Sequence, residues 1–219
     1  MDDGKVENCM NILAIETSLP HASLCLSRDG KVVFQTAWQT ARNHDEWLFP
    51  ALQKALDALE DAPLNTILVG AGPGSYGGVR VALAAAAGIA QVTGASVAAL
   101  CSWTQLAEIG AVVVSDARRG GWTIRRADGS VDVVSSEELH RMQEEGIRLL
   151  TIEAPGMMQQ KGISPDAEGL VPSAVGLVQT WEHMSASERT DALNAPAEPI
   201  YVRPPHITKA VHKPWEIRR

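Results

Sequence analysis

The sequence predicts an α/β protein built from two similar lobes, each a mixed β-sheet flanked by helices. The first observation is an element order that occurs twice: three strand-like segments, a helix, a strand and a second helix. The second is an Asp-Gly turn at a similar place in each unit, at Asp29-Gly30 and at Asp128-Gly129. Such self-similarity indicates duplicated lobes, and hairpins followed by crossover helices give mixed sheets. We expect a first lobe at 11–108, a second, degenerate lobe at 109–198, and a C-terminal tail at 199–219.

The elements of the first lobe follow from short apolar runs and the turn residues between them. The expected strands are 11–16, 21–27, 31–38, 67–69 and 95–100. The first helix is expected to begin at Asn43, a good N-cap residue, with Glu46 three positions later in a capping-box arrangement. A second helix is expected over 79–90, and a short one over 102–109.

The second lobe repeats this order in a shorter form. Its expected strands are 111–115, 121–126, 130–134 and 148–152. Ser135 is expected to cap a helix over 137–145, and a last helix is expected near 173–183. The segment 154–168 is rich in Gly and Pro and is expected to form a loop.

A glycine-rich loop between a strand and an apolar helix, within 66–94, is the most distinctive stretch of the chain. Its residues 72–77 match the pattern G-x-G-x-x-G, and a helix N-terminus after such a loop favours anions. The dinucleotide fingerprint also needs an acid about 20 residues further on, and 81–107 contains no Asp or Glu. A Walker loop needs Lys and Ser/Thr where this chain has Val79 and Arg80. We interpret the loop as serving tight turning and close helix approach rather than phosphate chemistry.

The helix after this loop has no polar face. Over 79–90 it consists of small and apolar residues, and Arg80 carries its one charge. Such a helix has to be covered on all sides, either by this chain or by another protein. Ala84 and Gly88 are four residues apart, so a second helix can approach closely there. The one other long apolar helix is at 48–59, and we therefore favour a second polypeptide on the outer side.

The charge is unevenly distributed. The chain has a net charge of −7, which argues against a stand-alone nucleic-acid binder. The segment 199–219 carries five Lys/Arg against one acid, a net +4, so the remaining 198 residues carry −11. A basic tail on an acidic body fits a contact for RNA or for an acidic partner, and equally fits a solvated tail.

Cysteine and histidine usage excludes several classes of site. Cys9, Cys25 and Cys101 have neither disulfide nor metal-ligand spacing, as is typical of a reducing compartment. No His pair has metal-site spacing and there is no H-E-x-x-H, so no metal is expected. The first eight residues are polar, and the longest apolar run, 81–90, is too short for a bilayer. We expect a cytoplasmic protein without membrane contact.

Five stretches carry a family resemblance. They are ILAIETS near the start, a helix opening at His44, GPGSYGGVR, DAR at 116–118, and PIYVRP near the end. In this order, over nearly the whole chain, they resemble the TsaB (YeaZ) family of tRNA threonylcarbamoyladenosine biosynthesis proteins. Gly77 departs from the Thr that is usual in the family, and Arg119-Gly120-Gly121 departs from a more typical Met-Gly-Glu. The element order is similar to the ribonuclease-H-like, or actin-like (ASKHA), fold.

The resemblance implies a non-catalytic scaffold or activating subunit. Family members pair with a TsaD-like catalytic subunit that makes N6-threonylcarbamoyladenosine at position 37 of certain tRNAs. The resemblance also implies a TsaE-like ATPase as a partner, tRNA contact through the complex, and a homodimer as an alternative assembly. No cofactor is implied within this chain, and ATP or ADP at the partner interface stays open.

The family pairs through the first two helices of the first lobe, here about 43–59 and 76–91. The residues that the resemblance places at this partner interface are His44, Trp47, Leu48, Leu52, Val79, Leu83, Ala84, Ala87 and Gly88. The residues that match two vestigial nucleotide loops are Glu16, Thr17, Ser18, Gly72, Gly74, Ser75, Arg80 and Asp116. No catalytic residue is expected.

The residues themselves also indicate that few groups in this chain are suited to catalysis. Asp116 is followed by Ala117-Arg118-Arg119, which is too bulky and charged to let the backbone approach a phosphate. Glu16 fits either a residue that orients a cation or water, or a strand-end acid that caps a turn. His44 fits a contact with a partner or ligand, or a structural place beside a helix cap. Arg80 fits an anion site or an ion pair with Glu16 or Asp116, and we favour the pair.

Two rival functions remain. An ATP-dependent phosphotransferase or ATPase of the same fold would bind Mg·ATP tightly and turn it over. A nucleotide-cofactor oxidoreductase would need the ribose-binding acid that the glycine loop lacks.

Overall fold

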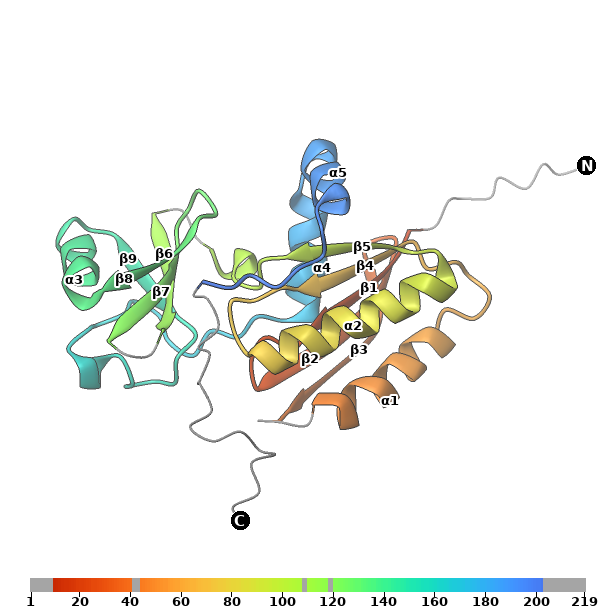
Figure 1. Ribbon diagram of the computed structural model, residues 1–219, viewed down its shortest axis with the longest axis horizontal. Helices are drawn as coiled ribbons and strands as arrows, with labels where there is room; N and C mark the ends of the chain where they lie inside the picture. Colours follow the sequence, from red (N-terminus) through yellow and green to blue (C-terminus); the bar gives the residue numbers. More distant parts are fainter. Residues whose placement is uncertain (1–9, 41–43, 108–109, 118–119, 203–219) are drawn as a thin grey trace, which may run out of the picture.

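Two β-sheets lie side by side in the computed structural model, which describes residues 10–40, 44–107, 110–117 and 120–202 (Figure 1). The larger sheet has helices on both faces, and the smaller sheet carries α3. The predicted fold class, α/β with two mixed sheets flanked by helices, is confirmed. No helix in the described part of the chain combines the length and apolarity that crossing a bilayer requires.

The larger sheet has five strands in the order β3-β2-β1-β4-β5. Their bounds are Asn11–Glu16 for β1, His21–Arg28 for β2, Lys31–Gln39 for β3, Thr66–Gly70 for β4 and Ser96–Leu100 for β5. β1, β2 and β3 are joined as antiparallel neighbours, whereas β4 runs parallel to both β1 and β5. Tight turns therefore link the first three strands, and helical crossovers link the parallel ones.

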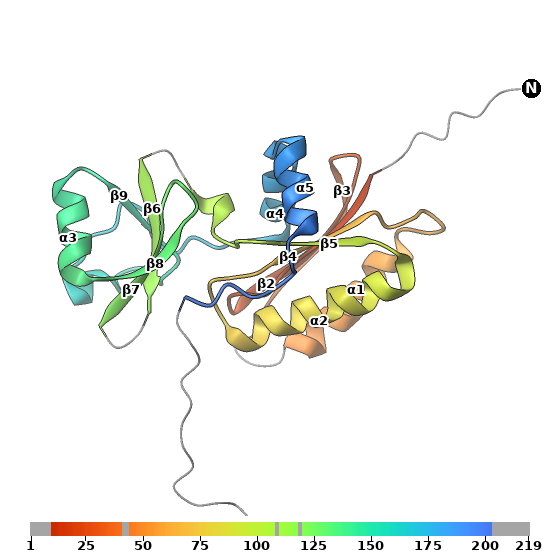
Figure 2. The same ribbon diagram turned by 45° about the horizontal axis from the view of Figure 1, so that its top comes forward.

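Helices bury the central strand β1 on both faces. The helices around this sheet are α1 His44–Asp57, α2 Tyr76–Thr93, α4 Ala174–His183 and α5 Ala186–Asn194. Successive strand side chains point to opposite faces, so Leu13 and Ile15 pack beneath α1 and α2, while Ile12 and Ala14 pack against α4 (Figure 2). Burial on both faces explains why this strand is a continuous apolar run.

Helices α4 and α5 lie within the stretch 109–198 that the sequence assigned to the second lobe, yet they pack against the first sheet. Leu177 and Trp181 of α4 join Leu68 and Leu100 in one buried cluster. The segment that forms α4 and α5 returns to the first sheet because the second face of that sheet is apolar and would otherwise contact water.

The smaller sheet has four strands in the order β8-β7-β6-β9. Its elements are β6 Ala111–Asp116, β7 Gly121–Arg125, β8 Val131–Ser135, α3 Ser136–Glu144 and β9 Arg148–Thr151. Val114, Trp122 and Ile124 meet Leu139 of α3 and Leu149 of β9 in the core of this lobe. Ser135 caps α3 by accepting a hydrogen bond from the Glu138 N–H, as predicted.

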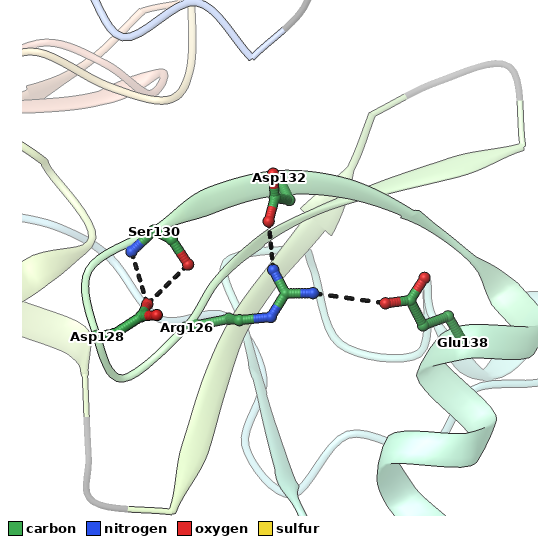
Figure 3. Close-up of polar contacts among 5 residues, drawn as sticks. All are labelled: Arg126, Asp128, Ser130, Asp132 and Glu138. Atoms are coloured by element: carbon green, nitrogen blue, oxygen red, sulfur yellow. Dashed lines mark hydrogen bonds and ion pairs between the residues drawn. The ribbon is translucent and has the colours of Figure 1, made fainter.

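Polar contacts hold the turn between β7 and β8 (Figure 3). The Asp128 carboxylate accepts hydrogen bonds from the Ser130 N–H at 2.9 Å and from its hydroxyl at 2.7 Å. Arg126 pairs with Asp132 on β8 and, at 3.4 Å, with Glu138 on α3. The predicted Asp-Gly turn is confirmed, with Gly129 at a φ of 89°.

The helix α5 was not predicted from the sequence, and one predicted helix is shorter than expected. Ser185 and Glu188 form a capping box at the start of α5, a signal that was present in the sequence. The helix expected over 102–109 is only a short 3₁₀ turn at Thr104–Leu106, with 108–109 outside the described residues. Asn43 also lies outside them.

Candidate functional site

A cleft of about 830 Å³ opens between the two sheets. The turn after β1 contributes Ser18, and the glycine loop contributes 73–77. Asp116 and Glu153 line it from the smaller sheet, and Tyr201 lines it from the C-terminal segment. The two segments predicted as vestigial nucleotide loops therefore meet at this cleft, since Ser18 and Asp116 both line it.

Backbone N–H groups of the glycine loop already form hydrogen bonds within the chain. The Ser75 N–H donates to the Ser18 carbonyl oxygen at 2.6 Å, and the Gly72 N–H donates to the Ser102 hydroxyl at 3.1 Å. The Ser75 hydroxyl caps α2 by accepting from the Gly78 N–H at 3.2 Å. These donors are therefore already paired and do not form an open phosphate cradle.

Two glycines let α2 approach the turn after β1 at backbone distance. A Cβ atom added at Gly78 would lie 2.0 Å from the Thr17 carbonyl oxygen, and one at Gly74 would lie 2.2 Å from that of Ser18. The Thr17 hydroxyl also donates to the Gly78 carbonyl oxygen at 2.8 Å. The close helix approach predicted from the glycine pattern is confirmed.

Glu16 is fully buried beneath the glycine loop. One carboxylate oxygen accepts a hydrogen bond from the Ser18 N–H at 2.7 Å, and the other would collide with a Cβ at Gly70. Burial raises the pKa of Glu16, and hydrogen bonds from Ser18 and Ser102 act in the opposite direction. Glu16 thus fits the strand-end acid that caps a turn, and it is absent from the cleft lining.

In the second segment, at Ser115 and Asp116, the hydrogen-bond donors are already bound to a carboxylate of the same chain. Glu153 accepts hydrogen bonds from the Ser115 hydroxyl at 2.6 Å and from the Asp116 N–H at 2.8 Å. The Asp116 carboxylate pairs with Lys161 at 2.7 Å. A phosphate at this loop would have to displace Glu153 or lie beside its charge.

The electrostatics of the cleft disfavour a polyanion. Its described lining includes the carboxylates of Asp116 and Glu153 and no Lys or Arg. Arg118 and Arg119 lie outside the described residues. No group of three or more His, Cys, Asp or Glu suited to a metal ion occurs in the part of the chain that the structure describes.

Arg80 does not form the expected ion pair with Glu16 or Asp116. It is exposed on α2, where its guanidinium contacts the Tyr76 hydroxyl and lies 5.0 Å from the centre of that ring. Tyr76 in turn stacks on Tyr201 with ring centres 5.4 Å apart. The expectation is wrong because Arg80 lies on the outer side of α2, whereas Glu16 is buried beneath the loop.

A second hollow, of about 670 Å³, is an apolar groove between α1 and α2. Phe49 and Leu56 line it from α1, and Val81, Ala84 and Gly88 line it from α2. Phe49 is 54% exposed, and Val92, one turn after Gly88 on α2, is 88% exposed. Trp47, which is 55% exposed, lies instead on the side of α1 that faces β3. Large apolar side chains gathered on one face mark an interaction surface in soluble proteins.

The structure divides the expected interface residues into two groups. The exposed ones are Trp47, Ala84, Ala87 and Gly88, and Leu83 is half-buried. His44, Leu48 and Val79 are buried within the chain, whereas Leu52 is buried but lines the groove between α1 and α2. The sequence analysis missed Phe49, which helical periodicity from Leu52 and Leu56 would have placed beside the groove.

His44 has a structural place at the start of α1. Its ring is buried, and its Nε2 would lie 3.3 Å from a Cβ added at Gly78. Burial lowers the pKa of His44, and the nearby Asp45 charge acts in the opposite direction. The His44 ring therefore packs against the first turn of α2.

Comparison with known proteins places this geometry among tRNA-modification proteins. A family model described as "TsaD: tRNA N6-adenosine threonylcarbamoyltransferase" matches residues 38–166. An uncharacterized protein of Mycobacterium tuberculosis is 32% identical over 202 residues, which cover 89% of this chain and 92% of the relative. The "tRNA threonylcarbamoyladenosine biosynthesis protein TsaB" of Escherichia coli is 28% identical over 225 residues, covering 89% and 95%. The solved YeaZ structure from Pseudomonas aeruginosa has the same fold, with a TM-score of 0.67 at 23% identity, covering 88% and 99%.

The close approach of α2 gives a matched pair of substitutions. Gly78→Ala should lower the free energy of unfolding by about 1–3 kcal/mol, because its Cβ has no room. Gly77→Ala should leave stability unchanged or raise it by up to about 1 kcal/mol, since a Cβ at Gly77 meets no atom within 4 Å. Urea denaturation of both variants measures the difference, and equal stability of the two would contradict the close approach.

The buried Glu16 should make stability depend on pH. Its raised pKa means that the folded protein holds this proton at pH values where the unfolded chain has lost it. Stability due to this group is therefore present below the ordinary glutamate value of 4.5 and is lost as pH rises through the folded-state pKa. Glu16→Gln should remove this loss, so the variant gains stability relative to wild type with rising pH. Parallel pH profiles of the two in urea denaturation would refute this account.

Proposed function

The chain belongs to the TsaB (YeaZ) branch of the TsaD family, and from this premise we propose that it is a non-catalytic subunit which pairs with a TsaD-like catalytic subunit. The product of the complex is N6-threonylcarbamoyladenosine at position 37 of tRNA. The name of the E. coli relative connects that protein with the biosynthesis of the same modification.

The observation that carries this proposal is the apolar groove between α1 and α2. An exposed aromatic side chain, Phe49, lies beside small residues on α2, Ala84 and Gly88. This combination suits a helix of a partner, because the small residues permit close approach while the aromatic ring supplies buried area.

The cleft supports the non-catalytic part of the proposal. Ser18 and Glu153 already accept hydrogen bonds from N–H groups of the two loops, and the described cleft lining carries no cation. An ATPase of the actin-like fold would instead need these donors free for phosphate oxygens.

Further partners and the location follow from the family and belong to the same proposal. A TsaE-like ATPase joins the complex, tRNA is contacted through the catalytic subunit, and any ATP or ADP sits at the subunit junction. The complex works in the cytoplasm.

Ala84→Arg should weaken binding of the TsaD-like subunit from the same organism about 30-fold or more, the size of a hot-spot effect. Ala84 is exposed in the groove, so the bulky side chain can point outward without unfolding the monomer. The matched control is Ala186→Arg on α5, an exposed position on the opposite face of the first sheet. Calorimetric titration with unchanged affinity for Ala84→Arg would mean that pairing uses another surface.

The rival ATPase function has its own test. The isolated protein should show neither saturable Mg·ATP binding nor phosphate release. Tight binding with turnover by the isolated chain would favour the ATP-dependent enzyme instead.

A further inference from the structure

The described part of the chain ends at the cleft between the two sheets. After α5 the chain runs back toward the smaller sheet, and Val202, the last described residue, lines the cleft (Figure 1). The Ile200 N–H donates to the Ala71 carbonyl oxygen at 2.9 Å, and the Tyr201 ring stacks on α2 as described above. The segment 203–219, which lies outside the described residues, therefore starts from the wall of the cleft.

The wall that belongs to the smaller sheet carries a carboxylate without a cation. Glu153 is half-buried and accepts hydrogen bonds from Ser115 and Asp116, but no Lys or Arg among the described residues pairs with it. Lys161 compensates only the second carboxylate of the lining, that of Asp116. Salt screens a partly buried charge less than an exposed one, so a cation that enters the cleft is attracted to Glu153.

A hydrogen-bond donor without an acceptor lies at the same cleft. Trp103 lines the cleft and is 1% exposed, and its indole N–H has no acceptor in the part of the chain that the structure describes. Buried donors in proteins are almost always hydrogen-bonded. A polypeptide segment is a suitable source of the acceptor, because each of its residues, proline included, brings a carbonyl oxygen.

The segment 203–219 has the composition that suits this cleft. It reads RPPHITKAVHKPWEIRR and contains five Lys/Arg and one Glu, a net +4, so the other 202 residues carry −11. Its Pro, Ile and Trp residues also match the apolar part of the lining, which includes Leu19, Pro20 and Ile152. The cleft is thus an acidic partner for this basic segment within the same chain.

The cleft is also within reach of the segment. An extended chain spans up to about 3.3 Å per residue, so the seven residues from Val202 to Lys209 can cover about 23 Å. Because the segment is tethered at the cleft, its effective concentration there is on the order of millimolar. A modest attraction is then sufficient for occupancy, an advantage that acidic surfaces elsewhere on the chain lack.

We propose that the basic segment 203–219 binds in the cleft of its own chain. Its cations lie beside Glu153, and one of its carbonyl oxygens accepts from the Trp103 N–H. The segment thereby covers the acidic wall of the cleft and competes with any other ligand that enters there. The groove between α1 and α2 takes no part in this contact, so the contact goes beyond the proposed function and can fail independently of it.

A spin label on the full chain marks the segment. Val211→Cys places a nitroxide within it once Cys9 and Cys101 are changed to Ser. The native Cys25 does not compete for the label, because it is buried and its burial raises the pKa of the thiol to about 11.

Paramagnetic broadening of the tryptophan indole N–H signals is the measurement. The Trp103 signal should lose most of its intensity, while that of Trp47, beside the exposed acids in the first turn of α1, should keep it. Lys209→Glu with Lys213→Glu in the labelled chain should restore the Trp103 signal, and so should high salt. The matched control, Lys31→Glu with Lys54→Glu at exposed positions of β3 and α1, makes the same change in net charge and should leave the broadening as it was.

Each remaining outcome overturns the contact. An unbroadened Trp103 signal in the labelled chain means that the segment stays outside the cleft, and broadening of Trp47 instead places it at the start of α1. Broadening that survives the change of both tail lysines contradicts the role of charge. A mixture of spin-labelled chain with unlabelled, ¹⁵N-enriched chain should show no broadening, and broadening there assigns the contact to the segment of another copy.

Discussion

The contact between α2 and the turn after β1 is the constraint on which the rest of the structure depends. At this contact two backbones lie closer than any side chain allows, because Gly74 and Gly78 face the carbonyl oxygens of Ser18 and Thr17. The contact fixes the depth of α2 on the sheet, and therefore which of its residues face outward.

Two surfaces with different chemistry result from this one contact. The cleft between the sheets is polar, yet the loop donors discussed above are paired within the chain, and its described ionisable lining is acidic. The groove between α1 and α2 is apolar and open. The cleft is therefore poorly suited to bind a phosphate group, whereas the groove is well suited to bind another polypeptide. A partner subunit of a modification enzyme requires a binding surface of the second kind.

The sequence predicted most of the fold because the relevant signals are local. Asp-Gly turns, short apolar strands and the Ser135 cap predicted most elements, and the glycine pattern predicted the close approach of α2. The site was harder to predict, because burial depends on which face of a helix meets the sheet. Leu48 and Val79 were placed at the partner interface and are core residues, whereas Phe49 was missed and is exposed. The expected partner of Arg80 was wrong for the same reason, since a shift of about two positions along a helix reverses the direction in which a side chain points.

The central claim is that this chain contributes a surface rather than a reacting group. The most direct measurement is the rate of threonylcarbamoyladenosine formation by the reconstituted complex carrying Asp116→Asn, a change confined to the polar cleft. The account predicts a rate close to that of wild type, because Asp116 pairs with Lys161 at the cleft wall rather than with a reacting group. A large loss of rate in a complex that still assembles normally would contradict the account, since the cleft would then take part in the reaction.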